Sequence, residues 1–164
     1  MNETAEQIIA ALGLAPAQTC GFTRVSFATE IETDALPAPF AAPRPIGTAL
    51  YFLVTPEAPV RPHRIRNDQL YHYYRGEPLE LLLLHGHGRT ERVTMGPDLA
   101  AGQHVQFFIP GGTFHTARVG GGWFLGGSTE WPGVVPADVE LGDVEMLAAR
   151  HPDVADTIRQ NALA

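Results

Sequence analysis

Residues 69–95 read QLYHYYRGEPLELLLLHGHGRTERVTM. Residues 69–74 and 79–85 are two runs rich in the aromatic and aliphatic side chains that pack well in strands. The glycines at 86 and 88 mark a turn, after which residues 92–95 return as the partner strand of a hairpin. This stretch therefore predicts antiparallel strands.

The same pattern continues on both sides of this stretch. Strand-like runs occur at 48–54, 104–109, 115–119 and 123–129, and glycine-rich or proline-rich turns separate them. No helical crossover lies between these runs, so we expect an antiparallel sandwich or barrel.

Both ends of the chain show helical patterns instead. Thr4 is placed to cap a helix that ends at Gly13, with Gln7 in the capping-box position. Residues 143–150 carry apolar side chains at helical spacing, and Pro152 begins a further helix. We expect these short amphipathic helices to pack on the strands.

The length of 164 residues suits one domain with a buried core. We expect a single domain over 1–164, with an N-terminal helix and loop at 1–20, a barrel at 21–130 and a helical segment at 131–164. The net charge is −7 and every basic residue is an arginine. This balance argues against nucleic acid or an anionic membrane as a partner.

The chain has one cysteine, Cys20, so it cannot form an intramolecular disulfide. Its N-terminus is acidic and lacks the basic start of a secretory signal. The most apolar run, 79–84, is too short to span a bilayer. These features predict a cytoplasmic protein.

Two spaced motifs carry the candidate chemistry: His63-x5-Gln69-x6-Gly76 and Pro110-x-Gly112-x2-His115. They resemble the two halves of the cupin signature, which lie on facing strands of a small jelly-roll barrel. Side chains alternate along a strand, so His63 and Gln69 can both point inward if the turn between them keeps the parity. The second motif would then bring His115 to the same depth.

A closer resemblance extends over most of the chain, through residues 48–54, 68–74, 76–84, 95–103 and Trp123. These residues resemble the cupin-5 branch of single-domain cupins. The resemblance implies an all-β fold, a double-stranded β-helix (cupin jelly-roll barrel) with short terminal α-helices, and a homodimer. It also implies a likeness in fold to sugar-nucleotide epimerases, while the activity of the branch is largely unassigned.

The chain departs from the pattern of this branch at four positions. Thr19, Val25 and Gln69 stand where the branch has carboxylates, while Arg24 is kept. His115 stands where the branch often has no histidine. These exchanges leave open whether the chemistry has changed or catalysis has been lost.

Two alternatives remain for the pocket histidines. His63, Gln69 and His115 could hold one divalent metal ion such as zinc, iron, manganese or nickel, because imidazoles are good ligands for these metals. The amide of Gln69 is a weaker ligand than a carboxylate. The alternative is a metal-free pocket in which the two histidines and the amide form hydrogen bonds.

The catalytic candidates are His63 and His115 as bases or acids, with Tyr71 or Tyr73 as an acid, because both tyrosines share the strand parity of Gln69. The alternative role for either tyrosine is aromatic packing. His72 has the opposite parity, so it is expected in sheet packing or at the dimer face.

Substrate contacts are expected from four further side chains: Arg24, Arg64, Gln69 and Trp123. Arg24 or Arg64 at the barrel mouth can hold a carboxylate or phosphate, and the alternative for each is a surface ion pair. Phe107, Phe108 and Phe114 are expected in the core or pocket wall. His85-Gly86-His87 is expected to be a solvated turn.

These observations favour a small-molecule enzyme, an isomerase, epimerase or lyase that moves a proton beside a carbonyl or carboxylate. The alternative is a binding protein for a sugar-like or acidic metabolite. In either case a small molecule is the expected ligand. The proline-rich segment from Pro37 to Pro45 is the expected crossing arm of the homodimer.

Overall fold

The computed structural model describes residues 3–40 and 43–163. Sheet A has the order β1 (Ala15–Pro16), β2 (Phe22–Ala28), β5 (Thr48–Val54), β12 (Phe124–Trp131), β7 (Asp68–Gly76) and β10 (Gln106–Ile109). Sheet B has the order β13 (Val139–Leu141), β6 (Val60–Ile65), β11 (Phe114–Val119), β8 (Leu79–Leu84) and β9 (Thr90–Met95). A separate hairpin pairs β3 (Glu32–Thr33) with β4 (Arg44–Pro45).

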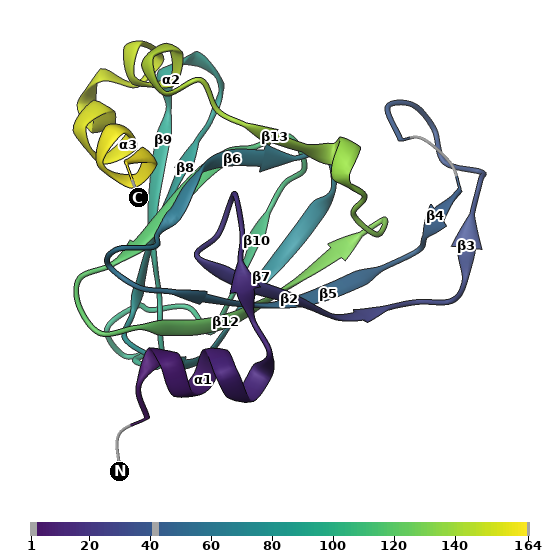
Figure 1. The fold of residues 1–164 in the computed structure, drawn as a ribbon. Helices are drawn as coiled ribbons and strands as arrows, with labels where there is room; N and C mark the ends of the chain where they lie inside the picture. The colour runs from purple at the N-terminus through teal and green to yellow at the C-terminus, as the bar shows by residue number, and fades with distance from the viewer. Residues whose placement is uncertain (1–2, 41–42, 164) are drawn as a thin grey trace.

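Successive strands from β5 to β13 alternate between the two sheets, except where β8 and β9 form a hairpin inside sheet B. The paired strands of both sheets run antiparallel, and the sheets enclose the interior of a barrel (Figure 1). This alternation is the jelly-roll arrangement. The prediction of an all-β jelly-roll barrel with short terminal helices is confirmed.

Strand β8 is buried on both faces, which explains why the run from Leu79 to Leu84 has leucines at both odd and even positions. Leu81 and Leu83 pack in the barrel core beside Phe52. Leu82 and Leu84 point the other way and pack under the C-terminal helices. A strand buried on both faces loses the alternation of a half-exposed strand, and each fully buried leucine contributes about 1.5–3 kcal/mol.

Three α-helices cover the outside of the barrel: α1 (Ala5–Leu12), α2 (Val144–Arg150) and α3 (Ala155–Ala162). Thr4 and Gln7 form the predicted capping box, and Gly13 ends α1 in the left-handed conformation with φ of 62°. Helix α1 packs on the outer face of sheet A, whereas α2 and α3 pack on sheet B. None of the helices in the described ranges is long and apolar enough to cross a membrane.

Some strand boundaries differ from the predicted ones. Strand β13 lies inside the segment expected to be helical, because it pairs with β6 at the edge of sheet B. The run at 104–109 is a strand only from Gln106, since His104 instead bridges to Met95. Phe108, expected in the core or wall, is 50% exposed on the edge strand β10.

The β3–β4 hairpin projects from the barrel in Figure 1. Its second strand, β4, belongs to the segment from Pro37 to Pro45 that is predicted to cross to a partner, and residues 41–42 of this segment lie outside the described residues. The base of the hairpin is tied to the barrel, because Arg44 forms a fully buried ion pair of 2.6 Å with Asp138. Asp138 ends a short 3-10 turn, Pro136–Asp138, just before β13.

Candidate functional site

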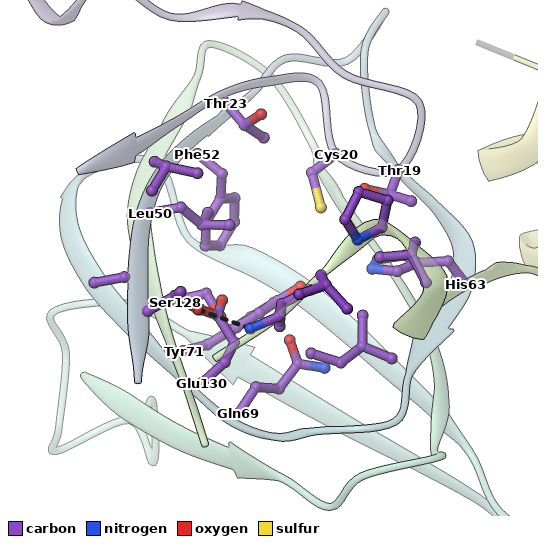
Figure 2. A pocket seen from close by; sticks show the side chains of 18 residues that line it. Thr19, Cys20, Thr23, Leu50, Phe52, His63, Gln69, Tyr71, Ser128 and Glu130 are labelled. Atoms are coloured by element: carbon purple, nitrogen blue, oxygen red, sulfur yellow. Dashed lines mark hydrogen bonds between the residues drawn. The ribbon is translucent and has the colours of Figure 1, made fainter. Parts of the chain in front are cut away.

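A cavity of about 320 Å³ lies inside the barrel (Figure 2). Its walls come from four strands of sheet A (β2, β5, β7 and β12), from β6 and β13 of sheet B, and from residues 19–20 and 134–136 outside these strands. Val25 of β2 lines the cavity and is 62% exposed, so the cavity reaches the surface at this strand. Most of the remaining wall is apolar. A few polar groups therefore decide what it can bind.

The register of sheet A arranges the polar groups in two rows. Glu130 of β12 is the register partner of both Thr48 of β5 and Gln69 of β7. Two residues further along, Ser128 lies between Leu50 and Tyr71 in the same way. Because side chains two apart share a face, both rows point into the cavity, as Figure 2 shows for Ser128, Glu130, Gln69 and Tyr71.

His63 enters the cavity from β6, and the predicted parity match with Gln69 is confirmed because both side chains line it. Its Nδ1 lies 2.8 Å from the carbonyl oxygen of Arg61. A carbonyl can only accept, so Nδ1 carries the proton and Nε2 carries a lone pair. Nε2 has no hydrogen-bond partner among the described residues. Burial lowers the pKa of His63 to about 4, so the ring is neutral at pH 7.

His115 of β11 is the register partner of His63 on the neighbouring strand, with 4.3 Å between the ring centroids. Its Nδ1 donates to the carbonyl oxygen of Thr113 at 3.2 Å, and its Nε2 accepts from the Tyr71 hydroxyl at 2.9 Å. Burial, and then the neighbouring His63, lower the pKa of His115 well below its ordinary value. Burial also raises the pKa of Tyr71. His115 and Tyr71 are therefore a neutral hydrogen-bonded pair.

Glu130 is a cavity residue that sequence reasoning missed. It is 2% exposed, and its Oε2 accepts a 2.7 Å hydrogen bond from the Thr48 hydroxyl. Burial raises the pKa of this carboxyl. The signal that could have found it is the strand register, which sets Glu130 beside Gln69. Glu130 thus supplies a carboxyl to the pocket from the neighbouring strand.

Two further polar groups face the cavity without a partner. The Ser128 hydroxyl is buried and has no hydrogen bond in the described part of the chain. Gln69 is 3% exposed as a residue, and its amide also makes no side-chain hydrogen bond there. Because buried polar groups are nearly always paired, these two groups favour a polar ligand in the cavity.

The donor set does not fit a resident metal ion. Both nitrogens of His115 are already engaged, which leaves one imidazole lone pair, on His63, together with the Gln69 amide and the Glu130 carboxyl, whose Oε2 is bonded to Thr48. The described residues contain no group of three histidine, cysteine, aspartate or glutamate side chains that could hold a metal. The metal-ligand role of His63, Gln69 and His115 stays a prediction, and no step proposed below uses a metal.

The remaining candidates lie away from this cavity. The Tyr73 hydroxyl donates to the carbonyl oxygen of Gly76, and its ring packs on Phe124 in the core. Trp123 packs against the α1 cluster, and its Nε1 donates to the carbonyl oxygen of Glu3 at 3.1 Å. The structure therefore does not bring Tyr73 or Trp123 together with His63.

The two arginines expected at the barrel mouth make other contacts. Arg24 donates to the carbonyl oxygen of Leu12 at 2.7 Å. Arg64 forms an ion pair with Glu140 at 2.7 Å and stacks on the Phe114 ring. No arginine is among the described residues that line the cavity. Arg64 therefore makes the surface ion pair given as its alternative, whereas Arg24 makes a hydrogen bond to a backbone carbonyl. The substrate-contact role of both side chains stays a prediction.

Cys20 and His72 lie on opposite faces of sheet A or its neighbouring loop: Cys20 on the cavity side and His72 on the outer side. Cys20 lines the cavity, and burial raises the pKa of its thiol to about 11, which leaves it unreactive as a nucleophile. His72 lies on the opposite face of β7 and is hydrogen-bonded to Thr129 and Gln106. It therefore belongs to the outer surface of sheet A.

The fold is that of a cupin. The profile of the family Cupin_5, described as Cupin superfamily (DUF985), matches residues 6–142. The chain belongs to this family. None of the curated proteins compared with the chain matched it.

Solved structures agree with this assignment. A hypothetical protein from Leishmania major has a TM-score of 0.86 and 25% identity, with 99% of this chain and 100% of that chain covered. A protein from Shewanella oneidensis has a TM-score of 0.86 and 26% identity, with 98% of both chains covered. A cupin 2 conserved barrel domain protein from Rhodopseudomonas palustris has a TM-score of 0.56 and 17% identity, with 96% and 86% covered, which shows the fold alone.

Proposed function

We propose that the chain is a small-molecule enzyme that moves a proton at a carbon beside a carbonyl or carboxylate, as an isomerase, epimerase or lyase does. The observation that carries this proposal is the unpartnered Nε2 of His63 in a largely apolar cavity. A neutral imidazole with a free lone pair can accept a proton from a bound substrate. Glu130 in the same cavity supplies the compensating carboxyl.

The proton path begins at His63. Its hydrogen bond to the Arg61 carbonyl holds the ring in one tautomer, so Nε2 accepts a proton from the substrate carbon without a tautomer change. The imidazolium that forms is buried and therefore costly. An ionised Glu130 lowers this cost, because opposite charges in one cavity stabilise each other.

Tyr71 is the proposed acid. Its hydroxyl donates to His115 Nε2, and the ring lines the cavity. Rotation about the C–O bond turns the same proton toward a substrate oxygen, where it stabilises developing negative charge. The unpartnered groups of Gln69 and Ser128 are the proposed substrate contacts, because each gains a hydrogen bond when a ligand enters.

Proton exchange in D2O tests the proposal without knowledge of the product. A panel of hydroxylated aldehydes, ketones and acids is incubated with the protein, and deuterium incorporation is followed by NMR. We expect exchange with at least one member, reduced about 100-fold in His63→Gln. His72→Gln is the matched control, because His72 lies on the outer face of the same sheet. Equal exchange rates in His63→Gln and wild type would overturn the proposal.

One observation favours the binding-protein alternative. A pKa of about 4 makes His63 a weak base, whereas an efficient general base titrates near the working pH. Under this alternative, a panel member raises the melting temperature but exchanges no deuterium. In that case His63→Gln lowers the affinity for this panel member, and neither wild type nor variant catalyses exchange.

We also propose a homodimer formed through the edge of sheet A. Strand β1 covers only Phe22 and Thr23 of β2, and the rest of that edge carries Val25 and Phe27, which are 62% and 63% exposed. An uncovered apolar edge strand favours pairing with a second copy. Light scattering at micromolar concentration should give the dimer mass for wild type and a monomer for Phe27→Glu. A monomeric wild type would contradict the proposal.

The cytoplasmic location stays a prediction.

A further inference from the structure

A second cavity, of about 410 Å³, lies on the other side of β6 from the pocket of His63. It is formed by the turn between β8 and β9, the C-terminal end of α2 and the start of β11. Its basic side chains are Arg64, His85, His87, Arg150 and His151. No aspartate or glutamate is among the described residues that line it. In a chain of net charge −7, this concentration of basic groups sets the cavity apart.

Three of these basic side chains are free to bind a ligand. Arg64 is paired with Glu140, and His85 lies 3.0 Å from Glu91, so both already have an acidic partner. Arg150, His87 and His151 make no side-chain hydrogen bond or ion pair within the described ranges. The C-terminal carbonyls of α2 carry partial negative charge, which Arg150 in the last turn offsets.

His151 gives an independent reason to expect a ligand. It is 4% exposed, its Nδ1 is buried without a partner, and the ring lines the cavity. The backbone holds it in place, because its N–H donates to the carbonyl oxygen of Leu147 at 3.0 Å. A buried imidazole without a partner is unfavourable, and a ligand that accepts from its N–H relieves that cost.

We propose that this cavity binds a small anion that carries a phosphate or carboxylate group. Arg150, His87 and His151 donate to the anionic group, because all three are hydrogen-bond donors without another partner. Leu84, Phe114 and Leu147 form an apolar wall for the body of the ligand. The site is separate from the proposed active site, since His63 and Arg64 point to opposite faces of β6.

NMR titration of the full chain with inorganic phosphate and, separately, with succinate tests the site. We expect saturable shifts of the backbone amides of residues 86–88 and 150–151 with at least one of the two anions. The anion that saturates identifies the preferred group. Arg150→Gln should weaken binding about tenfold, as expected for the loss of one charged hydrogen bond. His87→Gly should also weaken binding, and it suits the backbone because His87 has φ of 60°.

Two control variants make the outcomes decisive. Arg75→Gln removes the same charge from the exposed end of β7, so it should change affinity less than twofold. His63→Gln should also leave anion affinity unchanged, which separates this site from the proposed active site. Saturation by neither anion, or equal losses in Arg75→Gln and Arg150→Gln, would overturn the proposal. So would shifts confined to the residues around His63.

Discussion

Gln69 and Glu130 face each other across β7 and β12, and this pair makes a single-residue test of the pocket. Gln69→Glu places a second buried carboxyl beside the first. Each carboxylate then disfavours ionisation of the other, so we expect a loss of about 1–3 kcal/mol in unfolding free energy at pH 7. The loss should shrink as the pH falls and the pair takes up protons. Urea unfolding at pH 7 and pH 4.5 measures both effects.

The double variant Gln69→Glu/Glu130→Gln is the control, because it returns the pocket to one carboxyl and should recover most of the loss. Zinc or manganese added during thermal unfolding checks the metal alternative. A Gln69→Glu protein that metal stabilises clearly more than wild type would support a metal site, because a carboxylate balances the charge of the ion. It would contradict the metal-free pocket proposed above.

At the scale of one element, the backbone conformation at residue 76, the last of β7, requires a glycine. Its φ is +97°, and an added Cβ would overlap the carbonyl oxygen and ring of Trp123. Gly76→Ala should therefore cost more than about 2 kcal/mol. Gly120→Ala is the matched control, since nothing lies near its Cβ position and its φ is not in the left-handed region. Equal unfolding free energies for the two variants would show that Gly76 is not under this constraint.

Elements with a strong local signal were predicted from sequence. Helix α1 was found from its capping residues, and β8 from its apolar run between turns. Strand β13 was missed because its three exposed residues form a strand only by pairing with β6. Glu130 was missed for the same reason, since its place beside Gln69 depends on a register between strands distant in the sequence. The motif spacing did place His63 and Gln69 in one cavity.

At the scale of the whole molecule, the buried histidines make stability depend on pH. His63 has a pKa of about 4 in the fold, against an ordinary value of 6.5. Between these two pH values His63 is protonated in the unfolded chain but stays neutral in the folded chain. Stability contributed by neutral His63 is therefore present above pH 6.5 and falls by about 3 kcal/mol as the pH drops to 4. His115 acts in the same direction, because its pKa is also lowered.

His63→Gln should flatten this dependence in urea unfolding series from pH 7 to pH 4.5. Glu130 acts in the opposite direction, because burial raises its pKa and the folded state binds that proton first. Glu130 is present in both proteins, so the difference between their curves reports mainly on His63. Parallel curves for wild type and His63→Gln would mean that the folded protein protonates His63 as readily as the unfolded chain does.

The neighbourhood of Thr48, Glu130 and Gln69 across three strands also affects how cupins should be compared. A linear motif search reports this chain as lacking an acidic group, because position 69 is an amide. A comparison of register partners on adjacent strands finds the acidic group on β12, at Glu130, which is 61 positions later in the chain than Gln69. Pocket chemistry in this fold is therefore best compared by lateral position in the sheet, where an acid can move from one strand to the next without leaving the cavity.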